Sequence, residues 1–166
     1  MVIDKKFKGL VKEDYRYVFN GNIETTESLE IDLDMELFVT GYIKAGGSIK
    51  AGESIKAGWS IEAGESIEAG GSIEAGGSIK AGGSYGIVAG LSITCRATLS
   101  LGLKAFAGIC SWGDITDEDK TITCGKLESG TIEYGILRET GVEESDDKTQ
   151  EAMRLLKEQG YKIIRQ

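Results

Sequence analysis

The sequence predicts an all-β protein: a three-sided parallel β-helix with about 18 residues in each coil, followed by a small C-terminal strand–helix–strand cap. Two observations predict this fold. A six-residue consensus, S-I-[KE]-A-G-[GEW], recurs without a break between Lys44 and Gly83. The charged residue of the consensus changes from Lys to Glu and then back to Lys. The pattern leaves the handedness of the helix open.

The spacing of the isoleucines excludes an α-helix and favours short strands. In an α-helix, every sixth residue lies about 240° further round the axis, so the isoleucines would not share a face. A short strand that points Ile and Ala inward and Lys or Glu outward, followed by a glycine corner, fits the consensus. Small Ala and Ser are expected to fill a narrow interior. The isoleucines in step are Ile43, Ile49, Ile55, Ile61, Ile67, Ile73 and Ile79.

The charged column indicates how many sides a coil has. If three hexads complete a coil, each charged residue stacks on the residue 18 positions later, and every stacked pair has opposite signs. With two hexads per coil, Lys44 would stack on Lys56, and like charges on neighbouring strands about 4.8 Å apart oppose folding. A three-sided coil is therefore predicted. The opposite pairs are Lys44/Glu62, Lys50/Glu68, Lys56/Glu74 and Glu62/Lys80.

The hexad phase continues on both sides of the perfect repeat and predicts the domain organisation. The β-helix is expected over residues 23–112, with shifts of two residues between Met35 and Leu37 and again at Gly86–Ile87. Residues 1–22 are expected to form an N-terminal strand and cap. Residues 113–145 contain an acidic loop and further strands. Residues 146–166 are expected to form a helix, which Gly160 ends, and a short terminal strand.

Composition limits the classes of function. The 166 residues carry a net charge of −8 and include no histidine. The acidity argues against direct nucleic-acid binding. The lack of histidine removes the commonest general base and metal ligand, so we expect no enzymatic activity, no cofactor and no bound metal. No signal peptide or membrane-spanning run is present, so a cytoplasmic location without membrane contact is expected.

The three cysteines, Cys95, Cys110 and Cys124, form no CxxC pair. Their sparse and irregular spacing favours reduced thiols that pack in the core over a metal site. An exposed thiol at Cys124, beside Gly125, is the alternative.

The hexads resemble those of hexad-repeat β-helix proteins and, more loosely, those of the polymer-forming bactofilins. They are also similar to uncharacterised hexad-repeat proteins of low-GC bacteria and their phages. The likeness covers roughly residues 23–110. Many hexapeptide β-helices are acyltransferases and some are carbonic anhydrases. That resemblance implies catalytic or zinc-binding histidines, which this chain lacks, so neither activity is expected.

Candidate partner-binding residues lie at two places. Trp59 occupies the outward-facing variable position of the hexad, as do Glu53 and Glu65, and exposed aromatic residues are enriched at interfaces. Alternatively, Trp59 covers a terminal segment of the chain. Trp112 is expected to pack at the end of the solenoid. The second place is an acidic stretch that either mimics nucleic-acid phosphates or forms a solvated linker and helix N-terminus. Its residues are Glu143, Glu144, Asp146 and Asp147.

These features leave two hypotheses for function. The first is a non-enzymatic protein-binding or self-assembling scaffold that displays side chains on rigid faces, with a homo-oligomer as one form. The second is a small acidic inhibitor of phage type, similar to anti-CRISPR proteins. Such an inhibitor binds a host-defence or nucleic-acid-processing protein, with nucleic-acid mimicry as one mechanism.

Overall fold

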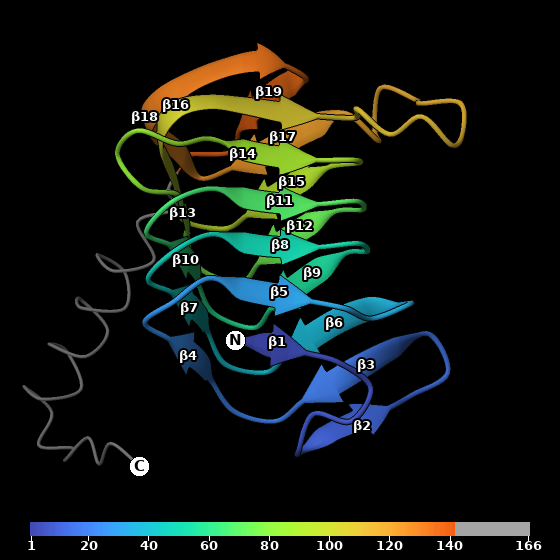
Figure 1. The fold of residues 1–166 in the computed structure, drawn as a ribbon. Helices are drawn as coiled ribbons and strands as arrows, with labels where there is room; N and C mark the ends of the chain where they lie inside the picture. The colour runs from blue at the N-terminus through green and yellow to red at the C-terminus, as the bar shows by residue number, and fades with distance from the viewer. Residues whose placement is uncertain (142–166) are drawn as a thin grey trace, which may run out of the picture.

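The computed structural model describes residues 1–141, which form a parallel β-solenoid of about five turns with roughly 18–20 residues in each coil (Figure 1). These residues contain strands and no helix, so the all-β prediction is confirmed. The helix and final strand predicted for residues 146–166 lie outside the described residues.

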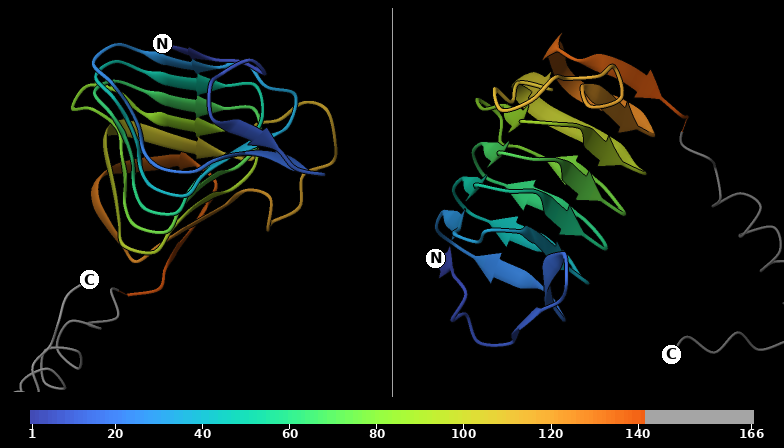
Figure 2. Two further views of the ribbon diagram at one scale, coloured as in Figure 1. Left: turned by 90° about the horizontal axis from the view of Figure 1, so that it is seen from below. Right: turned by 90° about the vertical axis from the view of Figure 1, so that its right-hand side faces the viewer.

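Each coil contributes one strand to each of three faces, which confirms the three-sided prediction. Figure 2 shows the triangular outline from below. Neighbouring strands on every face are parallel, except that β2 and β3 are antiparallel. Face A contains β1 (Val2–Ile3), β5 (Leu29–Ile31), β8 (Ile49–Ala51), β11 (Ile67–Ala69), β14 (Ile87–Ala89) and the second half of β16 (Thr98–Ala107).

Face B contains β2 (Leu10–Lys12), β3 (Arg16–Phe19), β6 (Glu36–Val39), β9 (Ile55–Ala57), β12 (Ile73–Ala75), β15 (Ile93–Cys95), β17 (Thr121–Cys124) and β19 (Ile136–Glu139). Face C contains β4 (Ile23–Thr25), β7 (Ile43–Ala45), β10 (Ile61–Ala63), β13 (Ile79–Lys80) and the first half of β16. The last strand, β18 (Lys126–Tyr134), follows β16 around the corner from face C to face A.

The coils are right-handed. In Figure 1 the strands of face A run from left to right across the front as the chain climbs, and the chain returns behind them. Crossovers between parallel strands are usually right-handed because strands have a right-handed twist. The structure therefore decides a point that the hexad pattern leaves open.

The interior matches the prediction for Ile and Ala but not for Ser. The repeat isoleucines are fully buried, and the alanines two positions later are 7% exposed or less. The serines lie half-buried at the corners. There, a serine hydroxyl accepts a hydrogen bond from the backbone of the next coil, as Ser54 Oγ does from the Ser72 N–H at 2.9 Å. The serine side chain thus links successive coils at the corner and does not fill the interior.

The predicted charge register is confirmed. Lys44 pairs with Glu62, Lys50 with Glu68, Lys56 with Glu74 and Glu62 with Lys80 in the strand ladders. Of these four pairs, Lys56 and Glu74 form an ion pair, with 2.6 Å between Nζ and Oε2. The two predicted shifts also appear, because Ile23 pairs with Ile43 and Ile67 pairs with Ile87 across steps of 20 residues.

The glycine after each repeat alanine, except Gly52, is required by the coil below it. A Cβ on Gly70 would clash with the carbonyl oxygen of Gly52, and one on Gly64 would clash with that of Gly46. Gly52 differs because nothing lies within 4 Å of a Cβ built there. Glycine at this position therefore reflects close backbone approach rather than a special backbone angle.

Parallel pairing extends beyond residues 23–112 at both ends. At the N-terminal end, β1 pairs with β5 and β3 pairs with β6. At the C-terminal end, β17, β18 and β19 continue the faces after an insertion at residues 108–120. The apolar phase of these strands places Tyr17 and Ile122 in the core, which explains why pairing continues.

We predict that Gly70→Ala destabilises the fold by about 1–3 kcal/mol, because the added methyl group meets a backbone carbonyl that cannot move without disturbing the ladder. Gly52→Ala, at the same corner one coil earlier, should leave stability unchanged or raise it by up to about 1 kcal/mol. Urea unfolding measures both. Equal effects of the two substitutions would contradict the stacking constraint.

We predict that Lys56→Glu lowers stability by about 0.5–1 kcal/mol, because it places like charges on adjacent strands. Adding Glu74→Lys should recover most of the loss by restoring an opposite pair. A double-mutant cycle by urea unfolding measures the coupling, and a coupling of zero would show that charge does not help to set the register.

Candidate protein-binding surfaces

Trp59 stands at the corner between faces B and C. Its amide donates to the Gly41 carbonyl at 3.0 Å, and its carbonyl accepts from the Gly77 amide at 2.8 Å. Because these stacked neighbours are glycines, no side chain from them covers the indole, and Trp59 is 69% exposed. Partner binding by Trp59 stays a prediction.

The other predicted partner-binding residues do not gather around Trp59. Glu53 lies at the corner between faces A and B, and Glu65 at the corner between faces C and A. One hexad forms one side, so successive variable positions must lie on successive corners. Glu65 accepts a hydrogen bond from Ser48 Oγ at 2.9 Å, which ties its side chain to the coil. The predicted sites Glu143, Glu144, Asp146 and Asp147 lie outside the described residues.

A surface that the sequence analysis missed lies on face A in the C-terminal coils. In the outward column of this face, Glu68 pairs with Val88, Val88 with Phe106, and Phe106 with Tyr134. Exposed residues at the adjoining corners extend it: Tyr85 is 44% exposed, Leu103 55% and Ile109 47%. We call the apolar members of this set the apolar surface: Tyr85, Val88, Leu103, Phe106, Ile109 and Tyr134. Val88 at a hexad position that otherwise carries Lys or Glu is the sequence signal that could have revealed it.

The insertion between β16 and β17 borders the apolar surface and projects from the stack (Figure 1). A groove of about 560 Å³ lies there, lined by Phe106, Gly108, Ile109, Cys110, Ile115, Glu133 and Tyr134. Trp112 lies on the insertion and is 71% exposed. The expectation that Trp112 packs at the end of the solenoid is wrong, because the chain leaves the stack before this residue.

One carboxylate, that of Glu133, lines this groove, and further carboxylates lie on the insertion that borders it. Glu133 forms an ion pair with Lys104 at 2.7 Å. On the insertion, the hydrogen bond and charge of Lys120 hold the pKa of Asp117 below its usual value. Hydrogen bonds from the Thr116 hydroxyl and amide lower the pKa of Asp119 in the same way. Both insertion carboxylates are therefore ionised at neutral pH.

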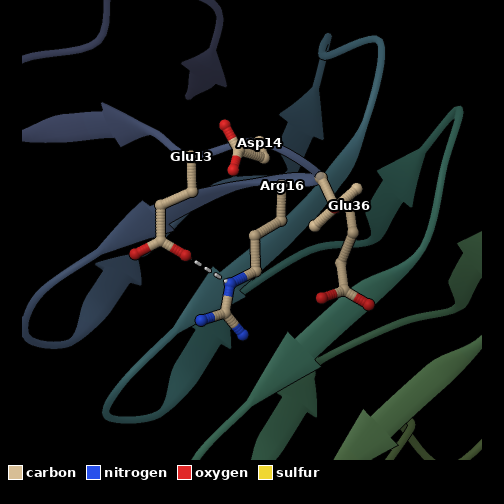
Figure 3. A pocket seen from close by; sticks show the side chains of 5 residues that line it. Glu13, Asp14, Arg16 and Glu36 are labelled. Carbon is tan, nitrogen blue, oxygen red and sulfur yellow. Dashed lines mark hydrogen bonds and ion pairs between the residues drawn. The ribbon is translucent and has the colours of Figure 1, made fainter.

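A second pocket, of about 680 Å³, lies near the N-terminus (Figure 3) and is lined by Glu13, Asp14, Tyr15, Arg16 and Glu36. Arg16 Nε donates to Glu13 Oε2 at 2.8 Å, and its guanidinium lies 4.8 Å from the centroid of the Phe38 ring. Arginine thus neutralises part of this acidic pocket. Within residues 1–141, no group of three or more His, Cys, Asp or Glu side chains is arranged to hold a metal ion.

Two of the cysteines pack in the core, as predicted, whereas Cys110 is half-buried and lines the groove, so its expected place in the core is wrong. Cys95 is 2% exposed and Cys124 is fully buried, so the alternative of an exposed Cys124 thiol is wrong. Burial, and secondarily the nearby Cys124, raises the pKa of Cys95 to about 12. Burial also raises the pKa of Cys124. Neither thiol is disposed to act as a nucleophile.

At the N-terminal end of the solenoid the core residues Ile3 and Ile23 are covered, although β1, β2 and β4 each pair on one side only within residues 1–141. Phe7, Leu10 and Phe19 pack against the core, with the rings of Phe7 and Phe19 5.7 Å apart. The segment before Phe7 is held by Lys5, whose Nζ lies 2.8 Å from Asp34 Oδ2, and the Tyr17 hydroxyl donates to the same carboxylate. The hydrogen bond from Lys5 is the main cause of the lowered pKa of Asp34.

At the C-terminal end of the solenoid, the last residues of the core-facing columns are partly exposed. Leu137 stacks on the fully buried Ile122 in the core-facing column, yet it is 36% exposed. Leu127 and Ile132 are likewise only partly buried above Leu99 and Ala105. Within residues 1–141, no strand pairs with the outer edge of β18 or β19.

Comparison with family models, with curated proteins and with solved structures gives no match. The resemblance to hexad-repeat proteins and bactofilins therefore stays a prediction. The part of the chain that the structure describes contains no helix long and apolar enough to cross a membrane.

We predict that Asp34→Asn lowers the melting temperature by a few degrees at neutral pH, because the contact with Lys5 and Tyr17 loses its charge. The pKa of Asp34 is lower in the folded state, so its contribution is present above the unfolded value, near pH 4, and is lost as the pH falls through the folded value. The difference from wild type should therefore shrink on acidification. Asp14→Asn, which removes no ion pair among residues 1–141, is the control. A difference that is constant with pH would contradict this account.

Proposed function

We propose that the protein is a non-enzymatic scaffold that self-associates through the C-terminal end of its solenoid. The observation that carries this proposal is the exposure of Leu137 above a core column whose preceding members are fully buried. Apolar side chains at the end of a core column are stabilised when a further layer covers them.

The strand edges at this end support the same proposal. The nine residues of β18 and the four residues of β19 pair on one side only, with β16 and β17 respectively, among the described residues. Unpaired edges present backbone N–H and C=O groups that favour pairing with another chain. A second solenoid end offers both the matching backbone groups and the matching apolar residues.

The packing at the N-terminal end favours contact between two C-terminal ends over head-to-tail stacking. Phe7 and Leu10 pack against the core at that end, so head-to-tail stacking would require them to move. Contact between two C-terminal ends involves no such change and has two-fold symmetry, which limits growth to a dimer. The dimer would display two sets of faces on one rigid rod.

The chemistry of the described residues supports a non-enzymatic role. The sequence has no histidine, and the two core thiols are buried with raised pKa values. The alternative of an acidic inhibitor rests on small size, net acidity and the lack of catalytic residues, with Glu143, Glu144, Asp146 and Asp147 as candidate mimics of nucleic-acid phosphates. These four residues lie outside the described residues, so that alternative stays a prediction.

Light scattering coupled to size-exclusion chromatography over a concentration series tests self-association. The mass should rise from monomer to dimer, and Leu137→Lys should keep the protein monomeric because it places a charge in the interface. Trp59→Ala, on a distant corner, should dimerise like wild type. Circular dichroism should show that both variants keep the strand content.

A monomeric wild type at every concentration would overturn the proposal. Growth into long polymers would overturn the two-fold geometry, because it would require the N-terminal end to take part.

A further inference from the structure

We propose that the groove between the apolar surface and the insertion binds a basic peptide segment of a partner protein, anchored by an aliphatic or aromatic side chain. This inference goes beyond self-association, since it concerns the side of the solenoid rather than its end.

The apolar surface follows three charged coils on face A. The outward column of face A begins at Val2, runs through Glu30, Lys50 and Glu68, and then changes to Val88, Phe106 and Tyr134. Exposed apolar residues flank the second half of this column on both corners. A contiguous apolar area of this kind, in contrast to a single exposed residue, marks an interaction surface.

The groove provides a place for an anchor side chain. Phe106 and Tyr134 form its wall on the solenoid, while Ile109 and Ile115 line it from the insertion. Trp112, on the same insertion, is 71% exposed. Aromatic residues beside a groove are the residue types that contribute most to binding energy at protein interfaces.

The charge near the groove indicates a basic occupant. Residues 113–120 include four acids, Asp114, Asp117, Glu118 and Asp119, and a single cation, Lys120. Lys120 is paired with Asp117, at 2.8 Å, and Lys104 is paired with Glu133. Arg138, on β19, adds a smaller favourable charge effect on Asp117. Asp114 and Glu118 form no ion pair within residues 1–141. A partner that carries Lys or Arg beside its anchor complements this potential, and an acidic partner is repelled.

The insertion is held in shape without a ligand. The Thr116 amide and hydroxyl both donate to Asp119 Oδ2, at 3.0 and 2.7 Å, and the Thr121 hydroxyl donates to the Asp117 carbonyl at 2.7 Å. The Cys110 amide donates to the Gly90 carbonyl, which fixes the start of the insertion on the coil below. A preformed groove reduces the entropy that binding must overcome.

Fluorescence anisotropy with labelled model peptides tests the inference on the full-length protein. A leucine–lysine peptide should bind. A leucine–glutamate peptide and an alanine–lysine peptide of the same length should each bind at least about tenfold more weakly, because each lacks one of the two required features. Raising the salt concentration should weaken the leucine–lysine complex, since charge contributes to it.

Variants on the insertion locate the site. Ile109→Asp and Trp112→Ala should each weaken binding about tenfold or more, and Asp114→Lys combined with Glu118→Lys should remove the preference for the basic peptide. All of these residues are exposed, so the fold should be kept, which circular dichroism checks. Trp59→Ala and Glu53→Lys, on other corners, are the matched controls and should bind like wild type.

Three outcomes would overturn the inference. The first is equal binding of the basic and acidic peptides. The second is equal weakening by the insertion variants and the matched controls, which would indicate general attraction to an acidic protein. The third is a loss of dimerisation, with peptide binding unchanged, in the insertion variants, which would make the apolar surface part of the contact between copies. Leu137→Lys should keep peptide binding, which separates this groove from the C-terminal end.

Discussion

The backbone ladder between stacked coils is the constraint on which the rest of the structure depends. Parallel strands lie about 4.8 Å apart, and this spacing brings the carbonyl of one corner against the next. Only glycine fits where Gly70 meets the carbonyl of Gly52. The same spacing lets Ser54 Oγ accept from the Ser72 amide and places Lys56 beside Glu74. The glycine, serine and charged positions of the hexad are therefore all determined by the spacing between stacked strands.

That constraint also limits where the molecule can bind anything. The interior is filled by Ile and Ala, and the faces of the regular coils carry stacked charges of opposite sign. Features that differ from this pattern arise where one residue departs from the hexad or where the repeat is interrupted. Trp59 replaces a small or acidic residue at a corner, and the insertion at residues 108–120 leaves the stack. The apolar surface forms where Val88 and Phe106 replace charged residues.

The two ends of the solenoid have different physical character. Aromatic packing of Phe7 on Phe19 and the charged contact between Lys5 and Asp34 close the N-terminal end. Both ends leave outer strand edges unpaired within residues 1–141, but the C-terminal end also keeps Leu137 exposed. The apolar surface belongs to the same third of the chain as this end. Self-association and partner binding would thus use neighbouring but separate surfaces.

The sequence by itself determined the three-sided coil, the pairing of Lys44 with Glu62 and the two-residue shifts, because stacking repeats one local rule at every coil. It also determined that the variable position faces outward, as Trp59 does. The tertiary structure alone decided the handedness, the role of the serines at the corners and the exposure of Trp112. It also brought Phe106, Ile115 and Tyr134 together around one groove. These last features depend on residues far apart in the chain and on an insertion without periodicity, so no local pattern could predict them.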